Sequence, residues 1–190
     1  MSKVVPSFTL ALAVFSSQLF AADKYQLEPN LSSVSFATIK NQFVVEPATV
    51  GGLQGEIDES GQFQLSADLT SISTAVPIRD TRLNELYFES ANHPVIKVSG
   101  SVDWNALSSG PKNMVVPAEV SMFGNSKRID FPVVMVQAGD YLTVSSVSPV
   151  IVNGGDFGIP AENLAKLAET VGGIPISPQV PLSITLTFKK

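Results

Sequence analysis

The sequence predicts an all-β domain of about eight antiparallel strands, arranged as a barrel or a sandwich. Three observations lead to this prediction. Runs of alternating apolar and polar residues recur along the chain, turn-forming residues separate them, and only one segment has a clear helical period. A chain of 190 residues is long enough for one domain with a substantial core and short for two.

The clearest predicted strand covers residues 180–188, which alternate without a fault after Pro181 and should therefore have one solvated face. Two short breaks, Gly124-Asn125 and Ala138-Gly139-Asp140, predict tight hairpins, because glycine and asparagine tolerate positive φ. Strands that are neighbours in sequence should then be neighbours in the sheet. Noisier alternation occurs in residues 34–36, 63–69, 96–102, 114–122, 128–137 and 141–150.

One helix is predicted over residues 160–171. Apolar residues recur there at spacings of three and four, Glu162 lies near the amino end, and Gly172-Gly173 follows. A second, short helix is expected at residues 81–86.

Residues 1–21 have the layout of a secretory signal peptide. Lys3 precedes an apolar run, and small residues at Ala21-Ala22 come directly before Asp23. An anchoring helix is the alternative, but the run contains Pro6 and is short for a membrane span. We therefore expect a mature domain of residues 22–190 in the periplasm or outside the cell.

Composition argues against several classes of function. The sequence has no cysteine, which excludes disulfides, thiolate metal sites and a lipid-modified terminal cysteine. Loss of Lys3 with the signal peptide changes the net charge from −5 to −6, and no basic runs occur, so nucleic acid is not an expected partner. With a single histidine and no clustered carboxylates, no metal site is expected either.

Motifs for catalysis are weak. His93, between Asn92 and Pro94, has no Gly-x-Ser-x-Gly element to accompany it and is interpreted as a solvated turn residue. Asp156-Phe157-Gly158 matches a kinase motif by three letters only; Phe157 should pack in the barrel mouth or touch a ligand. We predict that the protein is not an enzyme; an enzyme acting on lipids through His93 is a weak alternative.

Arg79-Asp80, Leu83, Phe88 and Pro94 fall at fixed intervals between two strand-like runs. This block resembles the YceI-like family, in which the corresponding connection lies across a lipocalin-like barrel. Residues 25–36, 156–158 and 180–188 extend the resemblance over nearly all of the mature chain. Two features differ: Leu53 replaces an aromatic residue, and the segment 160–178 is longer, which suggests a lid.

The resemblance implies a lipocalin-like β-barrel that binds, sequesters or transports a polyisoprenoid, an isoprenoid quinone or a similar long apolar lipid. It implies no cofactor other than this ligand. Transient membrane contact is compatible with such a role, and a homodimer is an open possibility. The candidate ligand-binding residues are Phe36, Phe63, Leu65, Ile96, Val98, Met122, Phe131, Val133, Phe157 and Leu164.

Sequence alone leaves open whether the barrel is hollow, since an eight-stranded barrel can also be filled by its own side chains. A filled barrel would suit a stress-linked module for protein contact. Together with the family resemblance, small residues interspersed among large apolar ones in the strands favour a hollow interior: Ala37, Ala67, Ser99, Gly100 and Ala118.

Two further features have two interpretations each. Arg79-Asp80 could meet a polar head group or pin the connection to the barrel rim; we favour the structural role, which leaves Arg82 as the freer cation. The apolar stripe of Leu164, Leu167 and Val171 could cap a cavity or lie on the outside of the barrel.

Overall fold

Eleven strands form one antiparallel sheet in the computed structural model, which describes residues 24–107 and 110–190. The predicted signal peptide lies outside the described residues. The strands are β1 (Tyr25–Leu27), β2 (Ser33–Lys40), β3 (Val44–Val50), β4 (Gln54–Ile57), β5 (Gln62–Asp68), β6 (Val95–Ser101), β7 (Lys112–Met122), β8 (Asn125–Ala138), β9 (Tyr141–Ser146), β10 (Val150–Asn153) and β11 (Gln179–Lys189).

The sheet closes into a barrel. Strands pair in the order β1-β4-β5-β6-β7-β8-β9-β11, and β1 also pairs with β11, which completes a ring of eight. The other three strands continue members of this ring toward its far end: β2 continues β1, β3 continues β4, and β10 continues β9. The barrel thus has eight long strands, three of them interrupted, and the predicted lipocalin-like fold is confirmed.

Both predicted hairpins are present. Met122 pairs with Asn125 across Phe123 and Gly124, whose φ values are 53° and 80°, as a type I′ turn requires. Ala138 pairs with Tyr141 across Gly139, with φ 58°, and Asp140. Each turn therefore joins strands that lie side by side in the barrel.

One predicted strand was wrong in extent. The run 141–150 is divided, because β9 ends at Ser146 and β10 begins at Val150. Pro149 lies in the gap and has no N–H to continue the ladder, while the Val147 N–H donates to Pro132 O at 2.9 Å. The segments Val44–Val50 and Gln54–Ile57 are strands that alternation did not reveal.

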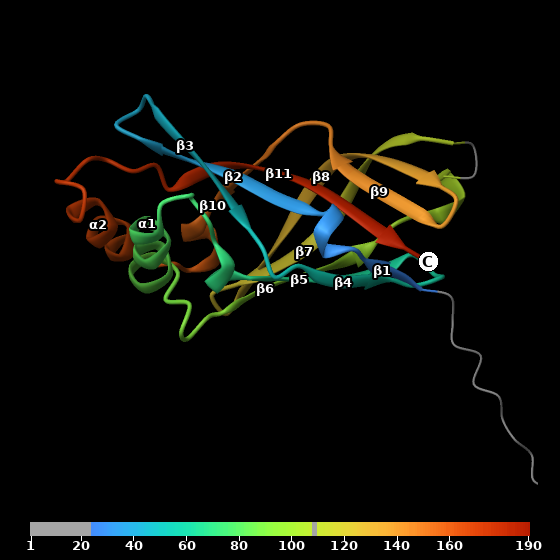
Figure 1. Ribbon diagram of the computed structural model, residues 1–190, viewed down its shortest axis with the longest axis horizontal. Helices are drawn as coiled ribbons and strands as arrows, with labels where there is room; N and C mark the ends of the chain where they lie inside the picture. Colours follow the sequence, from blue (N-terminus) through green and yellow to red (C-terminus); the bar gives the residue numbers. More distant parts are fainter. Residues whose placement is uncertain (1–23, 108–109) are drawn as a thin grey trace, which may run out of the picture.

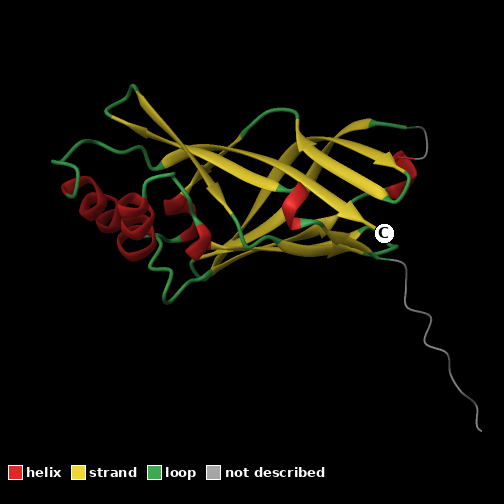
Figure 2. Cartoon of the chain, in the orientation of Figure 1, coloured by secondary structure: helices red, strands yellow, loops and turns green. Residues whose placement is uncertain are grey.

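The longer helices lie together at one end of the barrel (Figures 1 and 2). α2 (Ala161–Glu169) agrees with the predicted helix. The short helix predicted at 81–86 is present but begins earlier: α1 is Pro77–Arg82, and a π-helical turn, η3 (Leu83–Tyr87), follows it. Proline at the first helical position has its φ preset for a helix, which explains the earlier start.

Four short 3-10 turns complete the fold: η1 (Pro29–Leu31) between β1 and β2, η2 (Leu69–Ser71) after β5, η4 (Trp104–Leu107) after β6, and η5 (Gly154–Phe157) after β10. Each occupies a connection or an interruption, so none breaks the pairing of the ring.

Aromatic side chains close the end of the barrel opposite the helices. The rings of Tyr25 and Trp104 lie 5.5 Å apart, and Gln137 donates to the Tyr25 hydroxyl at 2.9 Å. Trp104 Nε1 donates to Asp58 O at 3.1 Å, and Leu107 is buried beside them.

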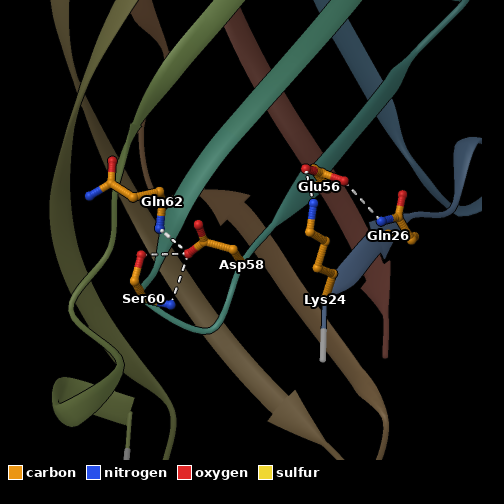
Figure 3. Close-up of polar contacts among 6 residues, drawn as sticks. All are labelled: Lys24, Gln26, Glu56, Asp58, Ser60 and Gln62. Atoms are coloured by element: carbon orange, nitrogen blue, oxygen red, sulfur yellow. Dashed lines mark hydrogen bonds and ion pairs between the residues drawn. The ribbon is translucent and has the colours of Figure 1, made fainter. Parts of the chain in front are cut away.

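The β4–β5 hairpin at the closed end is fixed by side chains on its surface (Figure 3). Asp58 Oδ1 accepts from the Ser60 hydroxyl at 2.6 Å and from the Gln62 N–H at 3.0 Å, and these bonds lower the pKa of Asp58. Glu56 pairs with Lys24 at 2.6 Å, and this contact lowers the pKa of the carboxyl. Because all these groups are exposed, the contacts fix the hairpin's geometry more than its stability.

Candidate functional site

A cavity of about 230 Å³ lies inside the barrel. It extends from Leu27 and Phe188 near the closed end to Leu164 and Leu167 of α2. Nearly all of its wall is apolar. On β11 the wall includes Val180 and Phe188, which are about 27 Å apart along the strand at 3.4 Å per residue. The site is thus a long, narrow, dry space.

Strand alternation supplies this wall. On β7 the even-numbered residues from Val116 to Met122 face the cavity, and the exposed Val115 points outward. On β11 the even-numbered residues from Val180 to Phe188 do the same. A period of two in a closed barrel puts one face of every strand in the interior.

All ten residues predicted from the sequence line this cavity. They come from five strands, from η5 and from α2: Phe36, Phe63, Leu65, Ile96, Val98, Met122, Phe131, Val133, Phe157 and Leu164. Their contact with a ligand remains a prediction. Sequence reasoning missed other wall residues, notably Leu83, Tyr87 and Phe88. The spacing that Leu83 and Phe88 share with the family could have identified these two residues as candidates for the wall.

Small residues contribute to the hollow interior, although not all of those predicted. Ala67 and Ala118 line the cavity. At Gly100, a Cβ atom would lie 2.5 Å from Cζ of Phe63, so this glycine admits the phenyl ring. Ala37 and Ser99 occupy the alternate, outward positions of β2 and β6, so this part of the prediction was wrong. The interior is nevertheless not filled by side chains.

The helical end is covered by α2 and the segment after it. Leu164 and Leu167 face the cavity, so the apolar stripe caps it, while Val171 faces a smaller pocket nearby. Asn163, which is 2% exposed, donates to Tyr87 O at 3.2 Å and to Glu89 Oε1 at 2.8 Å. These bonds anchor α2 on η3.

The long segment 160–178 continues this cover onto the end of β2. The Asn41 N–H donates to Pro175 O and the Ser177 N–H to Ile39 O, each at 2.8 Å. Ile176 lies between these contacts and lines the cavity. The extra length thus forms part of the cavity's cover, which agrees with the suggested lid.

The other side of this end is built from η3 and η5. Phe157 is 1% exposed and lines the cavity, and its carbonyl accepts from Asn125 Nδ2 at 2.9 Å. Gly158 follows with φ 80° and turns the chain toward α2. A Cβ at Gly154 would collide with the hydroxyl of Tyr87. The phenol is thereby buried, and burial raises the pKa of Tyr87.

Arg79 and Asp80 have the structural role that we favoured. Asp80 Oδ1 accepts from the Thr74 N–H at 2.7 Å and from its hydroxyl at 2.6 Å. Arg79 Nη1 lies 3.1 Å from Glu46 Oε1, and Lys40 Nζ lies 2.5 Å from the other oxygen of that carboxylate. The pair therefore joins α1 to the preceding loop and to β3.

His93 is not a fully solvated turn residue. It is half-buried, and its ring lies 4.0 Å from the ring of Phe123. Across residues 24–107 and 110–190, no group of three or more histidine, cysteine or acidic side chains is placed to hold a metal. None of the helices in those ranges combines the length and apolar character needed to cross a bilayer.

A family model for the YceI-like domain matches residues 25–188. The chain belongs to the YceI-like domain family. The match spans the whole barrel and its cover, so the resemblance seen in residues 72–95 extends over the complete fold. No curated protein matches the chain.

Two solved structures show the same fold. One is a polyisoprenoid-binding domain from Saccharophagus degradans, 25% identical, with a TM-score of 0.81 over 87% of this chain and 97% of that one. The other is BcnA from Burkholderia cenocepacia, 15% identical, with a TM-score of 0.66 over 85% of this chain and 98% of that one. Both span nearly all of the described YceI-like domain.

Burial of Tyr87 predicts an alkaline loss of stability. Because its pKa is raised, the folded protein keeps the phenol proton at pH values where the unfolded chain loses it, near pH 10. The free energy of unfolding should therefore fall as pH rises from about 10 through the folded pKa. Urea unfolding at pH 8 and pH 11 should show a smaller fall for Tyr87→Phe than for the wild type; an equal fall would contradict the assignment.

Proposed function

We propose that this YceI-like protein binds one long apolar lipid chain inside its barrel and releases it unchanged. The cavity carries this proposal, because it is apolar along its length. We place its entrance at the helical end, because Tyr25, Trp104 and Leu107 pack together at the other end. The likeness to a polyisoprenoid-binding domain supports a prenyl chain or an isoprenoid quinone as the ligand. A signal peptide at residues 1–21 would place the carrier in the periplasm or outside the cell.

The cavity volume limits how much of such a chain fits without rearrangement. A cavity of roughly 150 Å³ lined by similar side chains holds one benzene ring of six carbons. By proportion, 230 Å³ has room for about nine carbons, or nearly two isoprene units. A longer chain needs added space, which the flexible side chains of Met122 and Met135 in the wall can provide.

Energetics favour slow, selective exchange. Burial of each methylene from water contributes about 0.8 kcal/mol, so nine carbons contribute on the order of 7 kcal/mol. The same chain in a bilayer is already surrounded by hydrocarbon and gains almost nothing by leaving it. Uptake therefore depends on a close fit in the barrel or on a partner that removes the product.

A charge placed in the cavity should abolish binding. Phe131 faces the cavity from β8, and Phe131→Arg would put a cation where the chain must lie. Titration of delipidated protein with a fluorescent prenyl chain should saturate at one site, and the variant should lose at least about 100-fold in affinity. Equal binding by wild type and variant would contradict the proposed site.

Two further variants serve as controls. Val115 is 62% exposed on the outer face of β7, so Val115→Arg adds the same charge outside the cavity and should bind normally. Ala118→Leu fills part of the cavity without adding charge and should also weaken binding. A loss with Phe131→Arg alone would point to misfolding instead of a blocked site.

We also propose that the tip of the β2–β3 hairpin contacts the membrane during exchange. Phe43 is 84% exposed and Val45 is 61% exposed, and the hairpin lies beside Pro175 and Ile176 in the cover. An apolar tip of this kind is a marker of contact with a lipid surface or another protein. Its position at the helical end would bring the entrance to the bilayer.

Phe43→Ser should slow transfer of a fluorescent prenyl chain between vesicles several-fold, because an apolar anchor is lost, and should leave affinity within about twofold. Val115→Ser removes an exposed apolar residue from the barrel wall and should change neither quantity. Transfer at the wild-type rate by Phe43→Ser would exclude the hairpin as the membrane contact.

A stress-linked module for protein contact was the alternative for a filled barrel. The cavity supports the lipid-binding proposal over that alternative, because the interior is not filled by side chains. A homodimer stays a prediction without a structural argument in its favour.

A further inference from the structure

A second, smaller pocket of about 40 Å³ opens beside the helical end of the main cavity. The two spaces share four wall residues: Thr38, Leu83, Leu167 and Ile176. A chain that fills the main cavity and ends between these residues would place its head group in the smaller pocket. The pocket is therefore the natural end of the lipid site.

The wall of this smaller pocket is mostly apolar in area, but its charged side chains give it a net positive charge. It contains three cations, Lys40, Arg79 and Arg82, and one carboxylate, Glu46. Glu46 accepts contacts from both Lys40 and Arg79, at 2.5 and 3.1 Å. Asp80, the acidic residue directly after Arg79 in the sequence, does not line the pocket, and its carboxylate accepts hydrogen bonds from Thr74.

Of the three cations, Arg82 is the one that does not contact Glu46. Within the described part of the chain, its side chain has no ion-pair or hydrogen-bond partner, although it is half-buried. The side chains of Lys40 and Glu46 are only 16% and 21% exposed, so water screens this group of charges incompletely. A half-buried excess of positive charge favours an anion, and a guanidinium fits an oxyanion with paired N–H donors.

We propose that this pocket binds a single phosphate monoester at the end of the lipid chain. Its volume corresponds to about three water molecules at 10–15 Å³ each, which suits one phosphate group better than a diphosphate. The inference rests on the proposed function, because the tail must occupy the main cavity. It goes further by assigning the charge of the ligand and the residues that recognise it.

The test compares two ligands with the same tail. Delipidated wild-type protein is titrated with farnesol and with farnesyl monophosphate, in low and high salt. Farnesyl monophosphate should bind at least about tenfold more tightly, and salt should reduce this preference because the pocket is partly open to water. Inorganic phosphate alone should compete only weakly, since it lacks the tail.

Arg82→Gln identifies the site. It should reduce affinity for farnesyl monophosphate about tenfold and leave farnesol within about twofold, whereas Arg82→Lys should keep part of the preference. Arg128→Gln makes the same change of charge at a residue that lines neither pocket and whose side chain is 74% exposed, so it should behave as wild type. Equal losses in Arg82→Gln and Arg128→Gln would overturn the assignment.

The outcomes separate this inference from the proposed function. If farnesol and farnesyl monophosphate bind equally, the phosphate site is wrong and the barrel remains a lipid site. If neither binds, both proposals fail. A monophosphate preference that Arg82→Gln removes and Arg128→Gln preserves supports both.

Discussion

The cavity of this protein depends on closure of the barrel. Once β1 pairs with β11, one face of every strand is committed to an interior that water does not fill. The strands supply apolar residues on that face, while Ala67 and Ala118 keep it from being filled. A narrow dry cavity follows from the alternation and from these small residues together.

A dry cavity by itself does not make a carrier, because a lipid in a bilayer is already in hydrocarbon. The helical end has structural features in addition to the cavity. Asn163 anchors α2 over the cavity, and the exposed Phe43 projects from the neighbouring hairpin. Lys40, Arg79 and Arg82 are among the residues that line a small pocket at the same end. The cover, the exposed apolar hairpin tip and the charged side chains are thus concentrated at one end of the barrel.

Much of the interior could be predicted from the sequence, because a strand's alternation identifies its two faces. The eight predicted residues that lie in strands are on the cavity wall for this reason, while Phe157 and Leu164 reach it from η5 and α2. Ala37 and Ser99, which face outward, show where this approach fails. The small size of a residue does not indicate whether its side chain faces inward or outward when the inward face of the strand is unknown. The division of residues 141–150 by Pro149 has the same origin, since proline interrupts a ladder without ending the apolar pattern.

The charged pocket could not be predicted in the same way. Glu46 lies in β3, whose alternation is weak, and it meets Lys40 across a hairpin and Arg79 from a distant helix. Only tertiary structure brings the three together. The motif spacing marked Arg79-Asp80 as special and left Arg82 as the freer cation, but it could not show that Glu46 is the partner of Arg79.

Native ligand content tests the central claim most directly. Protein purified from its own host and extracted with organic solvent should release about one lipid per chain, identified by mass spectrometry as a prenyl chain with a phosphate or quinone head. Protein that is repeatedly empty, and that also rejects added prenyl chains, would contradict a lipid-binding role for the cavity.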